Sequence, residues 1–314
     1  MTAKILIYDT IIVGGGVTGF ASAMYAARLG LKVMVIAESL GGTIALANAV
    51  ENYPGFINIT GFELAEKIRN HAMEYPIDLE EDRVVHIKRD ENSLFVLTTM
   101  DRKTIHSKTI IFATGTKLKE LNVPGEKKFL KRGVHYCALC DGGFYKGLNV
   151  AVIGGADSAC MDALLLTQYA AKVYIIYRKD RLRPEPVTYN RIVKHPKIEI
   201  IYKTNVKEIH GDTKIDYLQL DNFHNGSDKL KIDGVFIAIG HTVLSDLAKE
   251  LSVELNDKNE VVTDKNAQTN IPGFFAAGDV TNGMFKQVIT GVGEGVHAAY
   301  SSYRYVTGTK FEYY

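Results

Sequence analysis

Short runs of β-branched residues alternate along this chain with stretches of helical periodicity, and glycine-rich turns separate them. Residues 5–13 and 32–36 are β-branched runs of the kind found in strands that are buried on both faces. Between them, residues 20–29 are mostly small and apolar, and Gly30 follows them. A glycine in this place is a common stop signal, so residues 20–29 predict a helix. Strand, helix and strand in this order predict a βαβ unit with a parallel sheet.

The same order of elements occurs again in the middle of the chain. Residues 149–153 are β-branched, residues 160–169 have helical spacing, and residues 172–177 form another β-branched run. A glycine-rich turn follows the first strand of each unit, beginning at Gly14 and at Gly154. The pattern therefore predicts an α/β protein with two domains.

The remaining apolar stretches complete these two domains. Helical patterns occur at residues 61–75 and 288–305, and strand patterns at residues 82–107, 108–114, 198–220, 234–240 and 271–279. Charges and a proline in residues 118–125 indicate a first crossing between domains, and residues 246–269 lead back to the first domain.

The turn of the first unit has the glycine spacing of a dinucleotide-binding site. Gly14, Gly16 and Gly19 form the pattern G-x-G-x-x-G, and Glu38 follows the second strand. The first glycine permits a tight turn, the second lets the backbone approach a pyrophosphate, and the third lets the helix pack closely. The helix start then offers amides to the phosphates, and Glu38 is placed to bind a ribose hydroxyl. We expect a nucleotide here, rather than a glycine turn without a ligand.

The second unit ends in basic residues where the first has an acid. They are Arg178, Lys179, Arg181 and Arg183. Arginine at this place accommodates a 2′-phosphate, so the pattern favours NADPH over NADH, and the alternative is a solvated basic loop. Ala156 stands where close phosphate approach favours glycine, which weakens the nucleotide prediction.

The bulk composition excludes several classes of function. The chain has 314 residues, 37 of them basic and 36 acidic, so its net charge of +1 gives no footprint for nucleic acid or for an anionic membrane. Apolar runs stay shorter than the roughly 18 residues that span a membrane, and Lys4 and Asp9 interrupt the apolar N-terminus, unlike a signal peptide. Three cysteines make no secreted disulfide framework. We expect a cytoplasmic protein.

Two cysteines, Cys137 and Cys140, are three positions apart, and Asp141 follows directly. Such a pair can close a disulfide or open to two thiols, and the acid can give or take a proton, but the pair needs an electron source. The two nucleotide turns on either side of it supply one. A structural zinc half-site with His135 is the alternative, but it would need a second pair of ligands. Cys160 is expected to be a core residue.

The C-terminal part adds candidate ligands of the first domain. The strand pattern of residues 271–279 ends at Asp279, on the usual ligand edge of an α/β sheet. The long helix then starts near Gln287, where amides and a positive dipole end would stabilise a developing anion.

Together these motifs resemble the low-molecular-weight thioredoxin reductases, a branch of the FAD-dependent pyridine nucleotide-disulfide oxidoreductases. The matching stretches lie between Ile11 and Thr307 and occur in the same order. They are Val13-Gly14-Gly15-Gly16, Val50-Glu51-Asn52-Tyr53-Pro54-Gly55, Ala113-Thr114-Gly115, Cys137-Ala138-Leu139-Cys140-Asp141-Gly142, Gly240-His241, Ala277-Gly278-Asp279 and Lys286-Gln287.

The resemblance implies two Rossmann-like dinucleotide-binding domains of three-layer ββα type, the second inserted into the first. Residues 1–117 and 246–314 would bind FAD, and residues 118–245 would bind NAD(P)H and contain the redox-active cysteines. The residues implied for FAD are Gly14, Gly16, Val17, Thr18, Gly19, Glu38, Gly42, Thr43, Asn52, Ala113, Thr114, Gly115, Gly278, Asp279, Lys286, Gln287 and Val288. Those implied for NADPH are Gly154, Ala156, Asp157, Ser158, Arg178, Lys179 and Arg183.

The resemblance also implies the reaction. Hydride would pass from NADPH to FAD, electrons would reach the disulfide at Cys140, and Asp141 would exchange a proton with the departing thiol. Cys137 would then attack the disulfide of a thioredoxin or glutaredoxin-like protein. His135 would tune Cys137 or contact the partner, or lie simply on the surface. The family is usually homodimeric, and its inner domain rotates between two arrangements.

Three residues depart from the family pattern: Thr43 replaces a glutamine near the flavin, Tyr177 a histidine of the 2′-phosphate cluster, and Ala156 a glycine. These departures concern the reductant, so NADH or a ferredoxin-like protein stays open as the electron donor. A dithiol oxidase that uses O₂ is a further alternative, although it would not need Arg178 and Arg183. Outside enzymes, the alternative is a flavin-loaded binding module.

Overall fold

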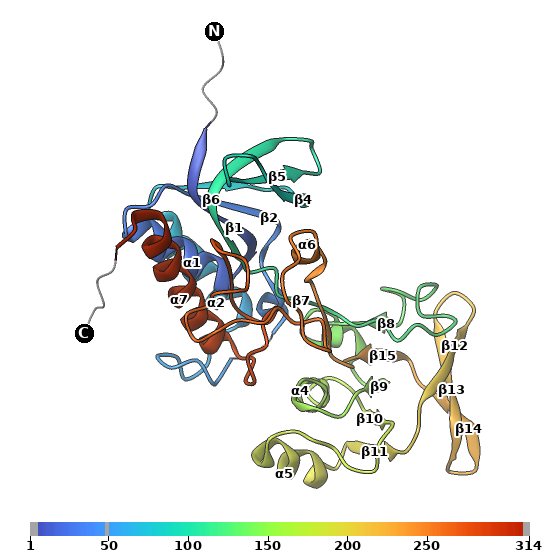
Figure 1. Cartoon of the computed structure of the whole chain (residues 1–314). Coiled ribbons are helices and arrows are strands. Elements are labelled where there is room, and N and C mark those ends of the chain that lie inside the picture. The colour runs from blue at the N-terminus through green and yellow to red at the C-terminus, as the bar shows by residue number, and fades with distance from the viewer. Residues whose placement is uncertain (1–5, 48–49, 310–314) are drawn as a thin grey trace. The chain divides into compact units, whose positions relative to one another are not determined.

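The computed structural model describes residues 6–47 and 50–309, without the side chains of Leu139 and Cys140. Two compact units make up this part of the chain. The first contains the described residues up to Lys117 and from Val243 onward, and the second contains Leu118–Thr242. The first is drawn in blue, teal and red in Figure 1, and the second mainly in green and yellow.

A mixed sheet forms the centre of the first unit, in the strand order β3–β2–β1–β6–β5–β4. Its strands are β1 (Ile7–Gly16), β2 (Val33–Gly41), β3 (Ile77–Glu80), β4 (Val84–Arg89), β5 (Phe95–Thr99), β6 (Thr104–Phe112) and β17 (Phe274–Ala276). Strands β3, β2, β1 and β6 run parallel, and β17 pairs in parallel with the C-terminal part of β6. A C-terminal segment thus completes a sheet that the N-terminal segment begins.

Helices cover one face of this sheet. They are α1 (Val17–Arg28), α2 (Gly61–Met73) and α7 (Val288–Thr307), with the short η1 (Thr43–Leu46) and α6 (Asp246–Lys249) elsewhere in the unit. Figure 1 shows α1 and α7 side by side. Their close approach depends on small residues, since a Cβ at Gly295 would lie 2.7 Å from Ser22 Oγ. Neighbouring β1 residues alternate between the two cores: Ile12 packs toward α1 and α7, and Ile11 toward α6.

The second unit has three layers of its own. Its elements are β8 (Val134–His135), α3 (Ala138–Asp141), η2 (Gly142–Tyr145), β9 (Asn149–Ile153), α4 (Asp157–Leu166), β10 (Lys172–Tyr177), α5 (Pro186–Lys194), β11 (Ile198–Tyr202), β12 (Val206–Gly211), β13 (Ile215–His224), β14 (Ser227–Lys231) and β15 (Gly234–Ile237). A parallel sheet in the order β11–β10–β9–β15–β8 lies between the helices and the antiparallel sheet β12–β13–β14.

The chain passes between the units through β7 (Thr116–Leu118) and β16 (His241–Val243), which pair with each other. The return to the first unit falls at Val243, three residues before the expected position 246. Thr114 and Gly115 hold the returning segment at Leu244 by hydrogen bonds within the first unit. The Thr114 hydroxyl donates to the Leu244 carbonyl at 2.7 Å, and the Leu244 amide donates to the Gly115 carbonyl at 3.0 Å.

Several element boundaries differ from those predicted. Helices α1 and α4 begin at Val17 and Asp157, three residues earlier than the apolar pattern indicated, because each starts directly at its glycine-rich turn. Strand β2 continues to Gly41, where residues 40–41 still pair with residues 15–16 of β1. Helix α5 was not predicted, although Pro186 at its first turn is a known helix-start signal.

Asp162 on α4 gives the second unit a pH-dependent stability. Burial raises the pKa of its carboxyl from 3.8 to about 7. Because the folded state binds this proton more tightly than the unfolded chain does, the free energy of unfolding falls as pH rises from about 4 to about 7.

We therefore expect Asp162→Asn to raise the melting temperature by a few degrees at about pH 8 and to change it little at about pH 5. Thermal unfolding of the holoenzyme, followed by circular dichroism at both pH values, measures this difference. Equal effects at the two pH values would show that ionisation of Asp162 is not the cause.

Candidate functional site

The turn between β1 and α1 is shaped by two glycines that packing requires. Gly14 has φ +124°, and a Cβ there would lie 2.2 Å from the Ala113 carbonyl oxygen. A Cβ at Gly19 would lie 2.0 Å from the Gly14 carbonyl oxygen. No side chain of another type fits either position, so α1 can begin directly against the ends of β1 and β6.

The middle glycine of this turn, Gly16, is not required by packing. A Cβ at Gly16 would meet only the Gly42 Cα, at an ordinary 3.7 Å. Packing therefore does not demand glycine at 16, whereas a phosphate approaching the backbone would. Helix α1 begins at Val17 without a side-chain cap, so its first-turn amides remain available to such a phosphate. These features fit the pyrophosphate of a dinucleotide.

Further FAD candidates surround this turn within the first unit. Thr18 packs on Gly278, where a Cβ would lie 2.7 Å from the Thr18 hydroxyl oxygen. The Thr43 hydroxyl donates to the Thr116 carbonyl at 3.1 Å. The exposed Glu38 lies beyond the turn, 4.0 Å from Arg83. The fold thus brings β1, β2 and the segment after β17 to the same edge of the sheet.

Asn52 and Gln287 are far apart in the chain but adjacent in the fold, because the Asn52 amide donates to Gln287 Oε1 at 2.9 Å. The Gln287 side chain also caps the backbone amide of Thr290, in a reciprocal capping box at the start of α7. The expectation that this helix start offers its amides to an anion needs correction here. One of them is already bound to Gln287, because a capping side chain satisfies an otherwise unpaired donor.

Two acids that were not predicted, Glu294 and Glu260, help to hold the loop after β17. Glu294 on α7 accepts from the Gly278 amide at 2.7 Å, and burial raises the pKa of its carboxyl. Lys286 pairs with Glu260 and also donates to the Asp279 carbonyl at 3.1 Å. The ammonium of Lys286 is therefore engaged in holding the loop after β17. Neither acid belongs to a recognisable motif, so only the fold identifies them.

The turn between β9 and α4 repeats the packing of the first turn. Gly154 has φ +147°, and a Cβ there would lie 2.2 Å from the Ala238 carbonyl oxygen. Ala156 is the residue before α4, which also begins without a side-chain cap. The Asp157 carboxylate accepts from the Glu185 amide at 2.7 Å, so it holds the loop before α5. Ser158 is exposed in the first turn of α4.

The loop that carries the basic cluster contacts the turn between β9 and α4. The Arg183 amide donates to the Gly155 carbonyl at 2.7 Å, which brings the cluster against the start of α4. Arg183 Nε donates to the Tyr177 hydroxyl at 3.0 Å, and the Tyr177 ring fills the space that a Cβ at Gly155 would need. Arg178 and Lys179 are exposed on the same loop. Tyr177 therefore orients one arginine of the cluster.

The dithiol segment lies on α3 in the second unit. Cys137 directly precedes α3 and is disulfide-bonded in this structure. Cys140 lies on α3, and its side chain is outside the described part. The Asp141 amide donates to the Cys137 carbonyl at 3.2 Å, which closes one turn and places the acid in the same turn as Cys137. Cys160 is a fully buried thiol on α4, whose pKa burial and Asp157 raise to about 12.

His135 lies next to this segment and is not a surface residue. It is 6% exposed, and its Nδ1 lies 2.8 Å from Asp141 Oδ2. The sequence left three roles open for His135: tuning Cys137, contacting the partner protein, or lying on the surface. Its burial excludes the third. The sequence carried no signal for this pairing, because the two residues belong to different elements.

The sequence profile of the pyridine nucleotide-disulphide oxidoreductases matches residues 8–295. The chain belongs to this family. A thioredoxin reductase from Treponema pallidum is 37% identical over 303 residues, which cover 95% of this chain and 97% of that protein. The crystal structure of Lactococcus lactis thioredoxin reductase covers 96% of this chain and 100% of its own, with a TM-score of 0.90 and 35% identity. The crystal structure of T. acidophilum thioredoxin reductase covers 95% of this chain and 98% of its own, with a TM-score of 0.87 and 36% identity.

These comparisons confirm the resemblance to thioredoxin reductases, the α/β fold and the assignment as an oxidoreductase of the pyridine nucleotide-disulphide family. They also confirm FAD and NADPH as the cofactors of this kind of enzyme. Within the described ranges, no helix is both long and apolar enough to cross a membrane.

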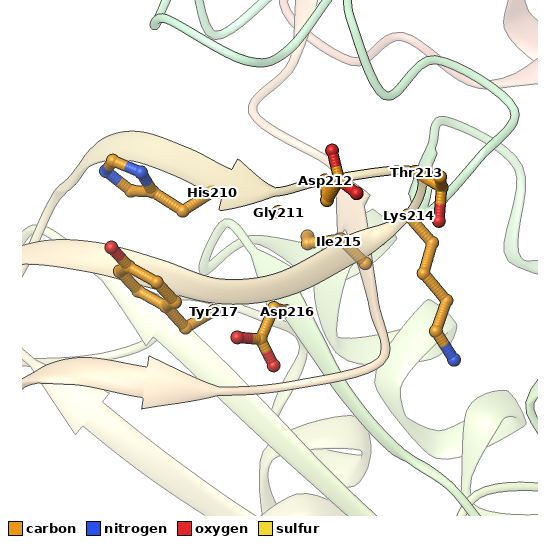
Figure 2. A pocket seen from close by; sticks show the side chains of 8 residues that line it. All are labelled: His210, Gly211, Asp212, Thr213, Lys214, Ile215, Asp216 and Tyr217. Atoms are coloured by element: carbon orange, nitrogen blue, oxygen red, sulfur yellow. The ribbon is translucent and has the colours of Figure 1, made fainter.

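A separate cup lies at the hairpin between β12 and β13 (Figure 2). It has a volume of 530 Å³ and is lined by residues 210–217. His210 and Tyr217 stack there with ring centroids 4.6 Å apart, and Glu208 pairs with His210 at 3.2 Å. None of the predicted site residues lies in this cup, so these residues offer controls for experiments on the dithiol.

Proposed function

We propose that this family member reduces a thioredoxin-like protein disulfide, with Cys137 and Cys140 as the exchanging pair and Asp141 as their acid–base group. The observation that supports this most directly is the order of groups on α3. A disulfide-bonded Cys137 begins the turn, and Asp141 ends it with its amide on the Cys137 carbonyl. The same unit also contains the second dinucleotide turn, so the proposed NADPH site and the dithiol belong to one continuous segment of the chain.

The first unit would hold FAD. Gly14, Gly16 and Gly19 would bind its pyrophosphate at the start of α1, with Glu38 at the ribose. Asn52 and Gln287, joined by their hydrogen bond, would line the flavin. When bound, FAD supplies the conversion of a hydride into an electron pair that a disulfide can accept.

The chain's own residues then handle the sulfur chemistry. Breaking the disulfide releases a thiolate, and Asp141 would donate the proton that this sulfur takes up. The thiolate of Cys137 would attack the partner's disulfide, form a mixed disulfide and release one partner sulfur as a thiolate. The Cys140 thiolate would then attack the Cys137 sulfur, so that the Cys137–Cys140 disulfide forms again and the second partner sulfur leaves as a thiolate. The partner is proposed to be a thioredoxin, the protein named in the relatives. Homodimerisation and a cytoplasmic location are also proposals.

NADPH is the proposed reductant because of the basic loop. Arg183 is anchored to Tyr177 and to the Gly155 carbonyl, and Arg178 is exposed on the same loop. Guanidinium groups in such a position suit the 2′-phosphate that distinguishes NADPH from NADH. Ala156 supports the second candidate, in which another donor such as NADH or a ferredoxin reduces the flavin.

Anaerobic titration of the yellow holoenzyme distinguishes these donors. We expect the first equivalent of NADPH to reduce the disulfide through the flavin and a second equivalent to bleach the flavin band, so about two equivalents are needed, with NADH reacting far more slowly at the same concentration. Reduced ferredoxin is the third arm. Bleaching by ferredoxin alone would exclude NADPH as the reductant and leave the dithiol chemistry unaffected.

The double variant Arg178→Ala/Arg183→Ala tests the basic loop. Removing two charge-assisted contacts should raise KM for NADPH by about 10- to 100-fold while changing KM for NADH less than about threefold. Steady-state kinetics with both nucleotides measures the split. Lys207→Ala/Lys214→Ala removes two exposed charges elsewhere in the unit and should change neither KM. Equal effects on both nucleotides would mean that this loop does not read the 2′-phosphate.

A further inference from the structure

His135 occupies a box of aromatic rings beside the dithiol segment. It lies on β8, whose residue pairs include His135 with Phe236 of β15. The imidazole stacks on Phe236 with centroids 5.2 Å apart and an angle of 26°, and Tyr145 meets both rings edge-on. The Tyr145 ring fits only because residue 234 is glycine, where a Cβ would lie 2.3 Å from Tyr145 Cε1. Packing therefore holds the imidazole in one orientation.

This orientation points each ring nitrogen at a titratable group. Nε2 lies 2.7 Å from the Tyr145 hydroxyl oxygen, and Nδ1 lies 2.8 Å from Asp141 Oδ2. The Tyr145 contact is a hydrogen bond. The Asp141 contact has the distance of an ion pair but not the alignment of a hydrogen bond. A buried ring nitrogen without an aligned hydrogen-bond partner lowers the free energy of unfolding. Packing alone therefore does not explain why a histidine occupies this position.

Tyr145 can serve both protonation states of the imidazole. Burial, together with the charges of Asp141 and Asp233, raises the pKa of Tyr145 to about 12, so its hydroxyl keeps its proton at neutral pH. A hydroxyl can donate to a neutral Nε2 or accept from a protonated one. When Tyr145 donates to the neutral ring, and also when the ring is doubly protonated, Nδ1 carries a proton on the side that faces Asp141, and a neighbouring carboxylate favours this tautomer. The next residue along β8, Tyr136, bonds instead to Glu126, outside this contact.

Asp141 links this buried pair to solvent. Its side chain is 29% exposed, whereas that of His135 is 5% exposed. Water can therefore reach the carboxylate but not the imidazole. The cluster has a closed end at Tyr145 and an open end at Asp141, and the Cys137–Asp141 turn lies at the open end.

We propose that His135 is a positioning residue for the dithiol reaction, which holds the Asp141 carboxylate and shares with it the proton that the departing sulfur takes up. This inference rests on the proposed acid role of Asp141. When the S–S bond accepts an electron pair and breaks, one sulfur leaves as a thiolate. The His135–Asp141 pair gives up its shared proton, an S–H bond forms, and neutral imidazole remains beside the carboxylate. Water at Asp141 restores the proton.

His135→Asn tests this role, since asparagine keeps an N–H near the Nδ1 position but cannot hold the extra proton. We expect disulfide reduction to slow by about 10-fold at neutral pH, with the alkaline fall of its rate shifted by about one pH unit toward acid. The rate is followed by stopped flow, as flavin absorbance returns after anaerobic reduction by one equivalent of NADPH. A second readout avoids the flavin: reduction of the same disulfide in the holoenzyme by dithiothreitol, quantified by alkylation and mass spectrometry.

Three further variants complete the test. Tyr145→Phe keeps the ring packing and should shift the pH profile in the same direction by a smaller amount. Adding His135→Asn to Asp141→Asn should slow the reaction no further than Asp141→Asn alone, because both act on one proton. His210→Asn is the matched control, a histidine that also has an acidic and an aromatic neighbour but lies in the β12–β13 cup (Figure 2). It should behave as wild type.

The outcomes separate this inference from the proposed function. An unchanged rate and pH profile in Asp141→Asn would remove the acid role itself. A slow Asp141→Asn enzyme, together with unchanged profiles in His135→Asn and Tyr145→Phe, would overturn the inference alone. Strictly additive effects in the double variant would also overturn it. If His135→Asn does not fold, an unshifted profile in Tyr145→Phe counts against the inference.

Discussion

Cys137→Ser should abolish protein-disulfide reduction while the protein keeps its yellow colour and its reduction by NADPH. A serine hydroxyl is a far weaker nucleophile than a thiolate and cannot form a disulfide, so we expect turnover to fall on the order of 10³-fold or more. Turnover is measured with a thioredoxin as substrate, and flavin bleaching is measured separately under anaerobic conditions. The two half-reactions are thereby separated, because only the second one needs the dithiol.

The third cysteine is the matched control for this variant. Cys160 is fully buried, and its high pKa keeps it a thiol at neutral pH. Cys160→Ala should therefore retain turnover, with at most a modest loss of thermal stability from the small cavity. Full turnover by Cys137→Ser would contradict the proposed exchange, and loss of flavin from Cys137→Ser would show a structural role instead.

Asp141→Asn should slow the dithiol steps by about 10²- to 10⁴-fold, since general acid–base groups contribute rate factors of this size. Flavin content and the rate of bleaching by NADPH should remain those of the wild type. The remaining rate should depend much less on pH, because asparagine has no proton to lose. Stopped-flow measurement of the dithiol step across neutral and alkaline pH tests both expectations.

Asp212→Asn provides the corresponding control. Asp212 is an exposed acid at the tip of the β12–β13 hairpin (Figure 2), in the same unit as Asp141. Neutralising it changes the net charge by the same amount without touching the dithiol segment. A comparable loss of rate in Asp212→Asn would assign the effect of Asp141→Asn to overall charge rather than to proton transfer.

Local patterns were sufficient to predict the two βαβ units. The reason is that each turn's own backbone requires glycine: Gly14 and Gly154 have positive φ angles, and a Cβ at Gly19 would lie 2.0 Å from the Gly14 carbonyl oxygen. A short spacing therefore reports the local geometry directly. Continuous β-branched runs also located the parallel strands, because burial on both faces leaves little choice of side chain.

Features that depend on distant partners could not be predicted in this way. Asn52 meets Gln287 from a distant part of the chain, and Glu294 holds the Gly278 amide from α7, which no motif connects with that loop. The pairing of His135 with Asp141 depends on the register of β8 with β15 and on the place of α3. Each contact is set by tertiary packing, which overrides local preference.

The element boundaries failed for a related reason. The apolar spacing identifies the buried face of α1 and α4 but not their first turns, where the chain faces the expected phosphate and needs no apolar residue. Helix α5 was missed because basic residues and prolines precede it, although its Thr188 and Ile192 are buried one turn apart.

The late position of α7 and β17 has a consequence for biosynthesis. Helix α7 packs along α1, and β17 pairs with β6, so the first unit lacks a helix and a strand until residues 274–307 have been made. The second unit is one continuous segment, Leu118–Thr242, and all its strands are complete well before. On the ribosome, domains fold as their sequence emerges. We therefore expect the inserted unit to fold first, while the N-terminal segment stays partly unpaired until β17 and α7 have been made.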